Sequence, residues 1–193
     1  MAFIGMRHPV WAPLESETAG QMPVYGTGVV VGGAISGTVS LQHNSTVLYA
    51  DDVEKESDKA ITGGTVSLVV DDLSDAVMAA IMGAIINEDN SVDVTSKTSP
   101  YGGYGYIRER SLQNKKSYTG TWVFKTQLSL NSENAQTKEQ NTSYQTTTLD
   151  GEMLGVQAEA DMETRFIRRK TFDTLEAATA WLDGLANLAS AGA

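Results

Sequence analysis

The stretch SYTGTWVFKTQLSL, residues 117–130, points to the fold class of this 193-residue chain. Large apolar side chains alternate here with polar ones, and a β-strand with one buried face produces this period of two. We therefore predict a long strand whose apolar face lies in a core. The residues assigned to this face are Tyr118, Trp122, Phe124, Leu128 and Leu130; the opposite face carries Ser117, Thr119, Thr121, Lys125, Gln127 and Ser129.

The same alternation on both sides of this stretch predicts a chain built mainly of strands. The patterns favour strands in AISGTVSLQHN (34–44), TVSLVV (65–70), YGYIRERSL (104–112), GEMLGVQAE (151–159) and RFIRRKTF (165–172). The polar segment NSENAQTKEQNTSYQ, residues 131–145, is predicted to be a surface loop. No internal repeat of solenoid or propeller period occurs in the sequence.

Two segments show a helical period instead. DLSDAVMAAIMG, residues 72–83, places Leu73, Val77, Ala80 and Ile81 on one stripe and ends at Gly83, a typical C-cap. Further on, Asp173 and Glu176 form a capping box. The apolar face that follows this box contains Ala178, Trp181, Leu182, Leu185 and Leu188. The predicted fold class is thus α+β and β-rich, with antiparallel strands in two packed sheets and two flanking helices.

Three parts are expected along the chain. Residues 1–33 form an N-terminal arm, because Pro9, Pro13 and Pro23 and the glycine-rich segment YGTGVVVGG (25–33) interrupt regular structure. Residues 34–172 form the β-rich domain, and 173–193 form a C-terminal helix and tail. The pattern leaves open whether the arm packs on its own domain or on a neighbouring subunit.

Charge and cysteine content exclude several classes of function. The chain has 24 acidic and 14 basic residues, a net charge of −10, which opposes binding to nucleic-acid phosphates and to anionic membranes. The longest apolar run, residues 76–86, is too short to cross a bilayer. Without cysteine there is no disulfide framework and no thiolate metal site. The start, MAFIGMRHPVWAPLESE, lacks the apolar core of a secretory signal, so a cytoplasmic product is expected.

A dense block of charge separates two of the predicted strands. In VLYADDVEKESDKAITGGTVSLVV, residues 47–70, seven of the nine residues from 51 to 59 are charged. A connection of this length exceeds a tight hairpin turn, and long loops are usually functional or disordered. We therefore predict a solvated loop over 51–64. Its candidate interaction residues are Asp51, Asp52, Glu54, Lys55, Glu56, Asp58 and Lys59.

The residues do not predict an enzyme, a cofactor or a metal site. The two histidines, His8 and His43, occur in no HExxH motif, and no GxSxG elbow is present, although a triad assembled across the fold stays open. YGTGVVVGG leads into a strand rather than a helix N-terminus, unlike a phosphate loop. Counting from Asp51, the sixth position is Glu56 instead of the glycine of an EF-hand. The basic run RFIRRK, 165–170, alternates between two faces, which favours salt bridges or subunit contacts over DNA binding.

A family resemblance emerges from the order and spacing of several segments. STVLYADDVEKESDKAITGGTVSLVVDDLSDAVMAAIMG (45–83) resembles the central block of siphophage major tail proteins, the tail tube subunits of long-tailed bacteriophages. The likeness rests on LYADD (48–52), TVSLVVDDL (65–73) and the short helix that closes at Gly83. SPYGGYGYIRE (99–109) and TTTLDGEML (146–154) resemble later shared segments, so the likeness covers roughly residues 34–157.

The resemblance implies a structural virion protein with a β-sandwich of two roughly orthogonal sheets and a flanking helix. Six subunits would close into a hexameric ring, and rings would stack into a tube around a tape-measure protein. Tail terminator and distal tail proteins would cap the ends, and DNA would pass through the lumen without specific binding. The loop over 51–64 would reach the adjacent ring. No enzyme activity or membrane contact is implied, and the product would be made in the host bacterial cytoplasm.

Other classes of function stay open beside this one. A related ring-forming protein, such as a distal tail protein or a type VI secretion tube protein, would share most of the pattern. A calcium-dependent surface-binding module would use the acidic block as a ligand cage, and calcium would then raise its melting temperature. A small hydrolase would require a deep apolar pocket.

Overall fold

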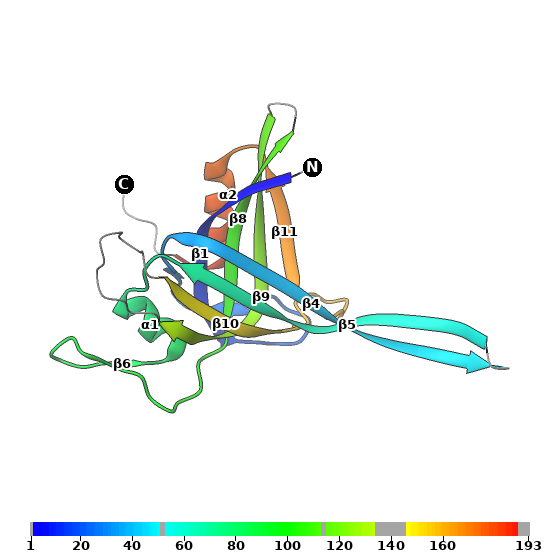
Figure 1. Cartoon of the computed structure of the whole chain (residues 1–193), viewed down its shortest axis with the longest axis horizontal. Helices are drawn as coiled ribbons and strands as arrows, with labels where there is room; N and C mark the ends of the chain where they lie inside the picture. The colour runs from blue at the N-terminus through cyan, green and yellow to red at the C-terminus, as the bar shows by residue number, and fades with distance from the viewer. Residues whose placement is uncertain (1, 51–52, 113–114, 134–145, 189–193) are drawn as a thin grey trace, which may run out of the picture.

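Two helices and eleven strands make up the part of the chain that the structure describes (Figure 1). The structure is a computed structural model, and it describes residues 2–50, 53–112, 115–133 and 146–188. All strand pairs are antiparallel, and strands far outnumber helices. The predicted fold class, α+β and β-rich, is therefore confirmed.

Strand β9 (Lys115–Glu133) joins two layers of strands. Its first half pairs with β8 on one side and with β11 on the other, whereas its second half pairs with β10. The first layer contains β1 (Ala2–Ser16), β8 (Gly102–Leu112), the first half of β9 and β11 (Ile167–Phe172). The second layer contains the second half of β9, β10 (Thr147–Leu154), β5 (Val53–Val70) and β4 (Ala34–Ala50).

The two layers cross steeply but belong to one hydrogen-bonded sheet. Figure 1 shows β8 and β11 running roughly vertically, while β4, β5 and β10 run roughly horizontally. The order through the sheet is β2-β1-β8-β9-β10-β5-β4, with β11 and β3 attached to β9 and β1. A second, two-stranded sheet consists of β6 (Ile85–Ile86) and β7 (Val92–Asp93). The expected pair of packed layers is thus produced by one continuous sheet that turns a corner at β9.

A bulge in β9 marks this corner and corrects the predicted strand face. Gly102 and Tyr104 of β8 pair with Thr126 and Val123, so two residues of β9, Phe124 and Lys125, oppose the single residue Gly103 of β8. An extra residue shifts the alternation of side chains and bends the strand. Trp122 and Phe124 therefore lie in one core cluster, whereas Leu128 and Leu130 lie in or against another. The prediction that all five apolar residues share one face is wrong for this reason.

The first core fills the space between the two layers. It contains the inward side chains of β5 and β10 and residues of β1, β8 and β9 that face them. Helix α1 (Asp75–Met82) closes one end of this core through the fully buried Ile81. As predicted, α1 ends at Gly83, which has a φ of 68° and donates its N–H to the Ala79 carbonyl. A left-handed C-cap of this kind is the conformation that glycine adopts at least cost.

The second core lies between the first layer and helix α2 (Leu175–Leu185). Gly105 makes this packing possible, because a Cβ there would come within 2.7 Å of Trp122 and 2.9 Å of Leu182. The predicted helix is present, but its N-cap is Thr174 rather than Asp173. The Thr174 hydroxyl accepts a hydrogen bond from the Ala177 N–H at 3.3 Å, which places the cap one residue later than the capping box predicted.

Residues 2–16 pack on their own domain, which is one of the two alternatives left open for the N-terminal segment, but they form a regular strand rather than an interrupted arm. β1 pairs with β8 from Ala2 opposite Ser111 to Pro13 opposite Gly102, and Trp11 is fully buried. Short strands β2 (Val24–Tyr25) and β3 (Val29–Val30) pair with its other edge. The sequence pattern did not predict this strand, because two register shifts, near Gly5 (φ 74°) and His8 (φ 52°), interrupt the alternation of side chains.

The segment 53–64 is also strand, so the prediction of an irregular loop over 51–64 is wrong there. β4 and β5 pair from Leu41 opposite Gly64 to Ala50 opposite Val53, with register shifts after Gln42 and after Leu48. Charged side chains do not prevent pairing when both faces of a two-stranded ribbon meet water. β10 reaches β5 only as far as Gly64, so residues 43–50 and 53–62 form a ribbon that projects from the body (Figure 1). Asp51 and Asp52 lie outside the described residues.

Candidate functional site

The ribbon (43–50 and 53–62) carries five of the seven residues predicted to interact with other subunits; Asp51 and Asp52 lie outside the described residues. Glu54, Lys55, Glu56, Asp58 and Lys59 all lie on its β5 strand, and Lys59 is exposed. Lys59 pairs with Ser45, and Asp58 pairs with Thr46. Every side chain whose exposure is described from 43 to 45 and from 59 to 62 is exposed. The structure therefore gathers these residues on one projecting element rather than on a loop.

Strand β4 has one edge that pairs with no strand of the described residues, and β1 packs next to this strand where Met6 lies against Gly37. The order of strands ends at β4, and within the described ranges no other strand pairs with the edge that faces away from β5. Its 17 residues include no Asp, Glu, Lys, Arg or Pro. Ile35 and Leu41 on this strand are 54% and 38% exposed. Soluble proteins usually protect such an edge with charge, proline or a covering element. β4 has neither charge nor proline.

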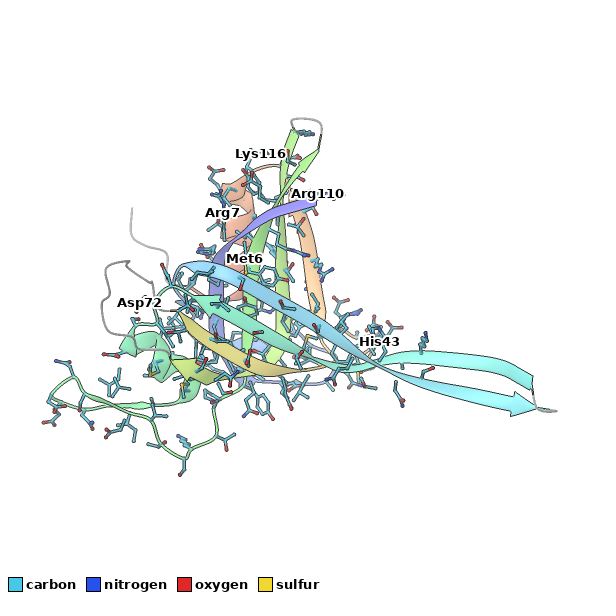
Figure 2. All side chains as sticks on the ribbon, viewed as in Figure 1. Met6, Arg7, His43, Asp72, Arg110 and Lys116 are labelled. Atoms are coloured by element: carbon cyan, nitrogen blue, oxygen red, sulfur yellow. The ribbon has the colours of Figure 1, made fainter. Side chains whose placement is uncertain are left out.

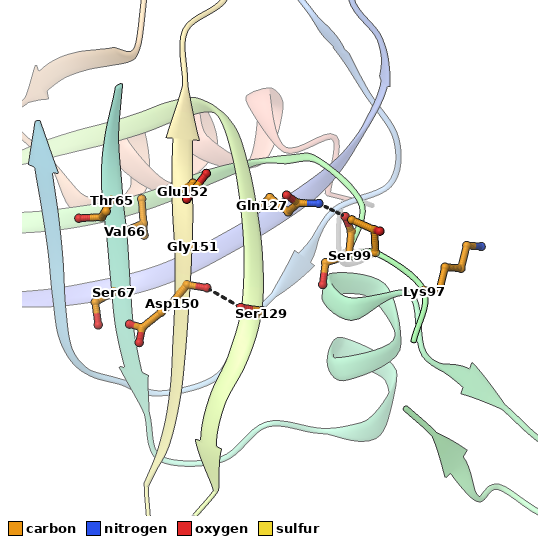
Figure 3. Close-up of a pocket in the computed structure, with 11 residues that line it drawn as sticks. Thr65, Val66, Ser67, Lys97, Ser99, Gln127, Ser129, Asp150, Gly151 and Glu152 are labelled. Atoms are coloured by element: carbon orange, nitrogen blue, oxygen red, sulfur yellow. Dashed lines mark hydrogen bonds between the residues drawn. The ribbon is translucent and has the colours of Figure 1, made fainter. Parts of the chain in front are cut away.

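The outward face of the second layer is polar. Its side chains line a shallow depression of about 760 Å³ next to the segment 97–99 (Figure 3). The Gln127 amide donates to the Ser99 carbonyl at 2.7 Å, and the Ser129 hydroxyl donates to the Asp150 carbonyl at 3.2 Å. The lining residues are Thr65, Val66, Ser67, Lys97, Thr98, Ser99, Gln127, Ser129, Asp150, Gly151 and Glu152. Five hydroxyls, one amide and two carboxylates thus lie along this depression, with Lys97 at its border.

The two histidines lie far apart in the fold. His8 bonds through Nε2 to Asp183 of α2 at 2.7 Å, and His43 lies at the base of the ribbon. Within the described residues, no three His, Cys, Asp or Glu side chains cluster as metal ligands would. Two of the basic residues of RFIRRK form ion pairs: Arg165 and Arg168 both contact Glu159. This region therefore serves internal packing in the isolated chain.

A basic end of the molecule is formed around the β8–β9 hairpin (Figure 2). Glu109 of β8 is buried, and its carboxylate lies 3.2 Å from Arg7 and 2.7 Å from Lys116. The hydrogen bond from Lys116 lowers the pKa of Glu109 below its ordinary value, and the charge of Arg7 adds to this effect. Lys115 lies 4.0 Å from Asp173 and is 81% exposed. This end therefore presents ammonium and guanidinium groups to solvent, held in place by a buried carboxylate.

The β6–β7 hairpin forms a second exposed feature, next to α1. Its turn is held by hydrogen bonds: the Asn87 side chain donates to Ser91 at 3.0 Å and to Asp93 at 2.9 Å. Asp89 accepts from the Ser91 N–H at 3.1 Å and from its hydroxyl at 2.6 Å, and these bonds lower the pKa of Asp89. Ile85 and Ile86 on this hairpin are about half exposed.

Sequence reasoning missed the open edge, the basic end and the β6–β7 hairpin. A signal for the first was present, because residues 34–50 contain no charge and no proline. Whether a strand lies at an edge is decided by topology, however, and strand order cannot be read from alternation. The basic end joins β1, β8 and β9, and so it also depends on pairing between distant segments.

No family model matches the sequence, and no curated protein matches it either. Among the described helices, none combines the length and apolarity that crossing a membrane requires.

Proposed function

We propose that the chain is the subunit of a bacteriophage tail tube, a structural virion protein that forms hexameric rings and stacks them into a conduit for DNA ejection. The single observation that carries this proposal is the open edge of β4. The family resemblance of residues 34–157 supports it independently.

The open edge favours assembly with further copies of the same chain. About half of the backbone N–H and C=O groups along the 17 residues of β4 point away from β5, as in any edge strand. Each such group that pairs with a second chain contributes roughly 0.5–1.5 kcal/mol net. A strand that joins a neighbouring subunit in a closed ring satisfies these groups and removes the edge. Ile35 and Leu41 would then be covered as well.

The ribbon supports stacking of the rings. It projects beyond the body, where it makes no strand pair except its own, and it has charged residues along β5. In a stack of rings, such a ribbon reaches the adjacent ring, and Glu54, Lys55, Glu56, Asp58 and Lys59 would pair with polar groups there. One exposed ion pair contributes only about 0–1 kcal/mol. Six copies in each ring multiply this contribution.

The polar face of the second layer suits a conduit for DNA. Asp150 and Glu152 project from it among hydroxyl and amide side chains. Like charge gives a passing phosphate backbone no gain from counterion release, so DNA would slide without binding. In the proposed tube, the partners of the subunit are further copies of itself, a tape-measure protein in the lumen, and terminator and distal tail proteins at the ends.

Negative-stain electron microscopy of the concentrated protein tests the proposal. We expect rings or tubes at high concentration, and separate particles of one subunit at every concentration would contradict it. The double variant Thr38→Lys with Ser40→Lys places charge on the edge strand and should abolish rings. Its matched control is Ser67→Lys with Thr65→Lys on β5, because these residues pair directly with Thr38 and Ser40. The control has the same charge on the neighbouring strand and should still assemble.

A further inference from the structure

The β6–β7 hairpin and the residue that follows it expose about half of the surface of three aliphatic side chains. Ile85, Ile86 and Val94 are 54%, 48% and 57% exposed. Adjacent residues in a strand point to opposite faces, so Ile85 and Ile86 place apolar surface on both sides of the hairpin. Two-stranded hairpins are marginally stable alone. The hydrogen bonds of Asn87 and Asp89 nevertheless fix its turn, which makes the hairpin a preorganised docking element.

The charge around this hairpin has one sign. From residue 71 to residue 96, the chain contains six carboxylates and no lysine or arginine. This segment includes α1 and the β6–β7 hairpin, which lie at the lower left of the molecule in Figure 1. We call this surface the acidic end. Its six carboxylates are Asp71, Asp72, Asp75, Glu88, Asp89 and Asp93.

The opposite end of the molecule has the complementary charge. Figure 2 places Arg7, Arg110 and Lys116 at the top of the view, around the β8–β9 hairpin. This basic end has five cations and three carboxylates, a net charge of +2 in a chain whose total is −10. The cations are Arg7, Arg108, Arg110, Lys115 and Lys116, and the carboxylates are Glu109, Asp173 and Glu176.

We propose that the acidic end of one copy docks on the basic end of the next, with the β6–β7 hairpin against the β8–β9 hairpin. A contact between two different surfaces of the same chain is heterologous, and it propagates in one direction. The alkyl stems of Lys115 and Lys116 cover the aliphatic side chains while their ammonium groups meet the carboxylates. Placing this contact between successive rings rests on the proposed tube function; the contact itself does not.

Single charge reversals test the contact. Lys115 is 81% exposed, and its contact with Asp173, itself 86% exposed, is 4.0 Å long, so Lys115→Glu leaves the fold intact. Glu88 is exposed at the acidic end, and Glu88→Lys reverses that side. Each variant places like charges against each other in the docked pair. We expect each to raise the critical concentration for association, measured by light scattering and sedimentation, by roughly tenfold.

The combined variant gives the decisive comparison. Lys115→Glu with Glu88→Lys restores opposite charges across the contact and should return the critical concentration to within about threefold of the wild-type value. A mixture of the two single variants should also associate, because the acidic ends of one meet the basic ends of the other. The control is Arg169→Glu with Glu88→Lys, which has the same net charge but alters β11 instead of the basic end. In this control, the critical concentration should stay as high as in Glu88→Lys alone.

The outcomes separate this contact from the tube function. Normal assembly of both single variants, or failure of the combined variant to recover, would overturn the contact while leaving the tube proposal standing. Rescue accompanied by linear chains without rings would support the contact and contradict the tube. A wild-type chain that stays monomeric at every concentration would overturn both.

Discussion

The strands β4 and β5 pass through two different environments, and the contrast separates what folds this protein from what it does. At residues 64–70, β5 has a partner on each side, and Val66, Leu68 and Val70 are fully or almost fully buried. At residues 53–62, the same strand pairs only with β4. Burial in the body supplies folding free energy. The ribbon side chains whose exposure is described, at 43–45 and 59–62, are all exposed. We propose that this part of the sequence serves assembly rather than folding.

The largest expected effect is on the body. Trp122 is fully buried between β9 and α2, and Trp122→Ala should lower the free energy of unfolding by roughly 3–5 kcal/mol. Chemical denaturation followed by circular dichroism measures this. The matched change in the ribbon is Ile61→Ala, since Ile61 is 41% exposed and should cost much less. Equal losses of unfolding free energy at the two sites would contradict the proposed difference between body and ribbon.

A smaller effect is expected where a buried polar group holds the second core together. The Tyr25 hydroxyl donates to the Phe124 carbonyl at 2.7 Å and accepts from the Trp122 indole at 3.3 Å. Burial raises the pKa of Tyr25 to about 12. Tyr25→Phe leaves both partners unpaired and should cost about 1–3 kcal/mol in a denaturation experiment. A loss below the error of the measurement would show that water reaches these groups.

The basic end predicts a dependence of stability on pH. Because the pKa of Glu109 is lowered in the folded state, the unfolded chain binds a proton here more readily. The contribution of Glu109 is present above its ordinary value of 4.5 and is lost as the pH falls below it. Glu109→Gln should therefore flatten the decline of the unfolding free energy with acid. Lys116→Gln, which removes the main cause of the lowered pKa, should flatten it too; an unchanged slope in both would contradict this assignment.

The regular parts of the fold could be predicted from the sequence, and the interruptions could not. Alternation located β8 and β11 beside β9, and Gly83 correctly marked the end of α1, but the strand predicted over 151–159 is β10, which begins at Thr147 and ends at Leu154. Alternation failed for β1, where register shifts near Gly5 and His8 break the pattern, and at the β9 bulge, where one extra residue sends Trp122 and Leu128 into different cores. Bulges depend on the partner strand, and a single sequence does not specify the partner.

The sequence predicted which residues form the candidate site but not the structure in which they lie. The charged block drew attention to the ribbon, but charge alone predicted a loop, since isolated segments of this kind rarely form strands. Pairing with β4 decides otherwise, and the openness of β4 follows from strand order. The acidic and basic ends are likewise products of topology, because Arg7 and Lys116 come together through β1, β8 and β9.

The smallest effect on stability is expected from removing the ribbon. Gln42 and Gly63 face each other in register, so a two-residue Asn-Gly turn can replace residues 43–62 and close the hairpin there. Shortening the connection changes closure entropy slowly with length, so the unfolding free energy should change by less than about 1 kcal/mol. A loss of several kcal/mol would show that the ribbon belongs to the folding unit.

Electron microscopy of this shortened protein, concentrated beside the full chain, tests the central claim most directly. The claim is that the ribbon serves the stacking of rings and the body serves folding. We predict folded subunits or single rings from the shortened chain under conditions in which the full chain forms tubes. Tubes of normal length from the shortened chain would contradict the account.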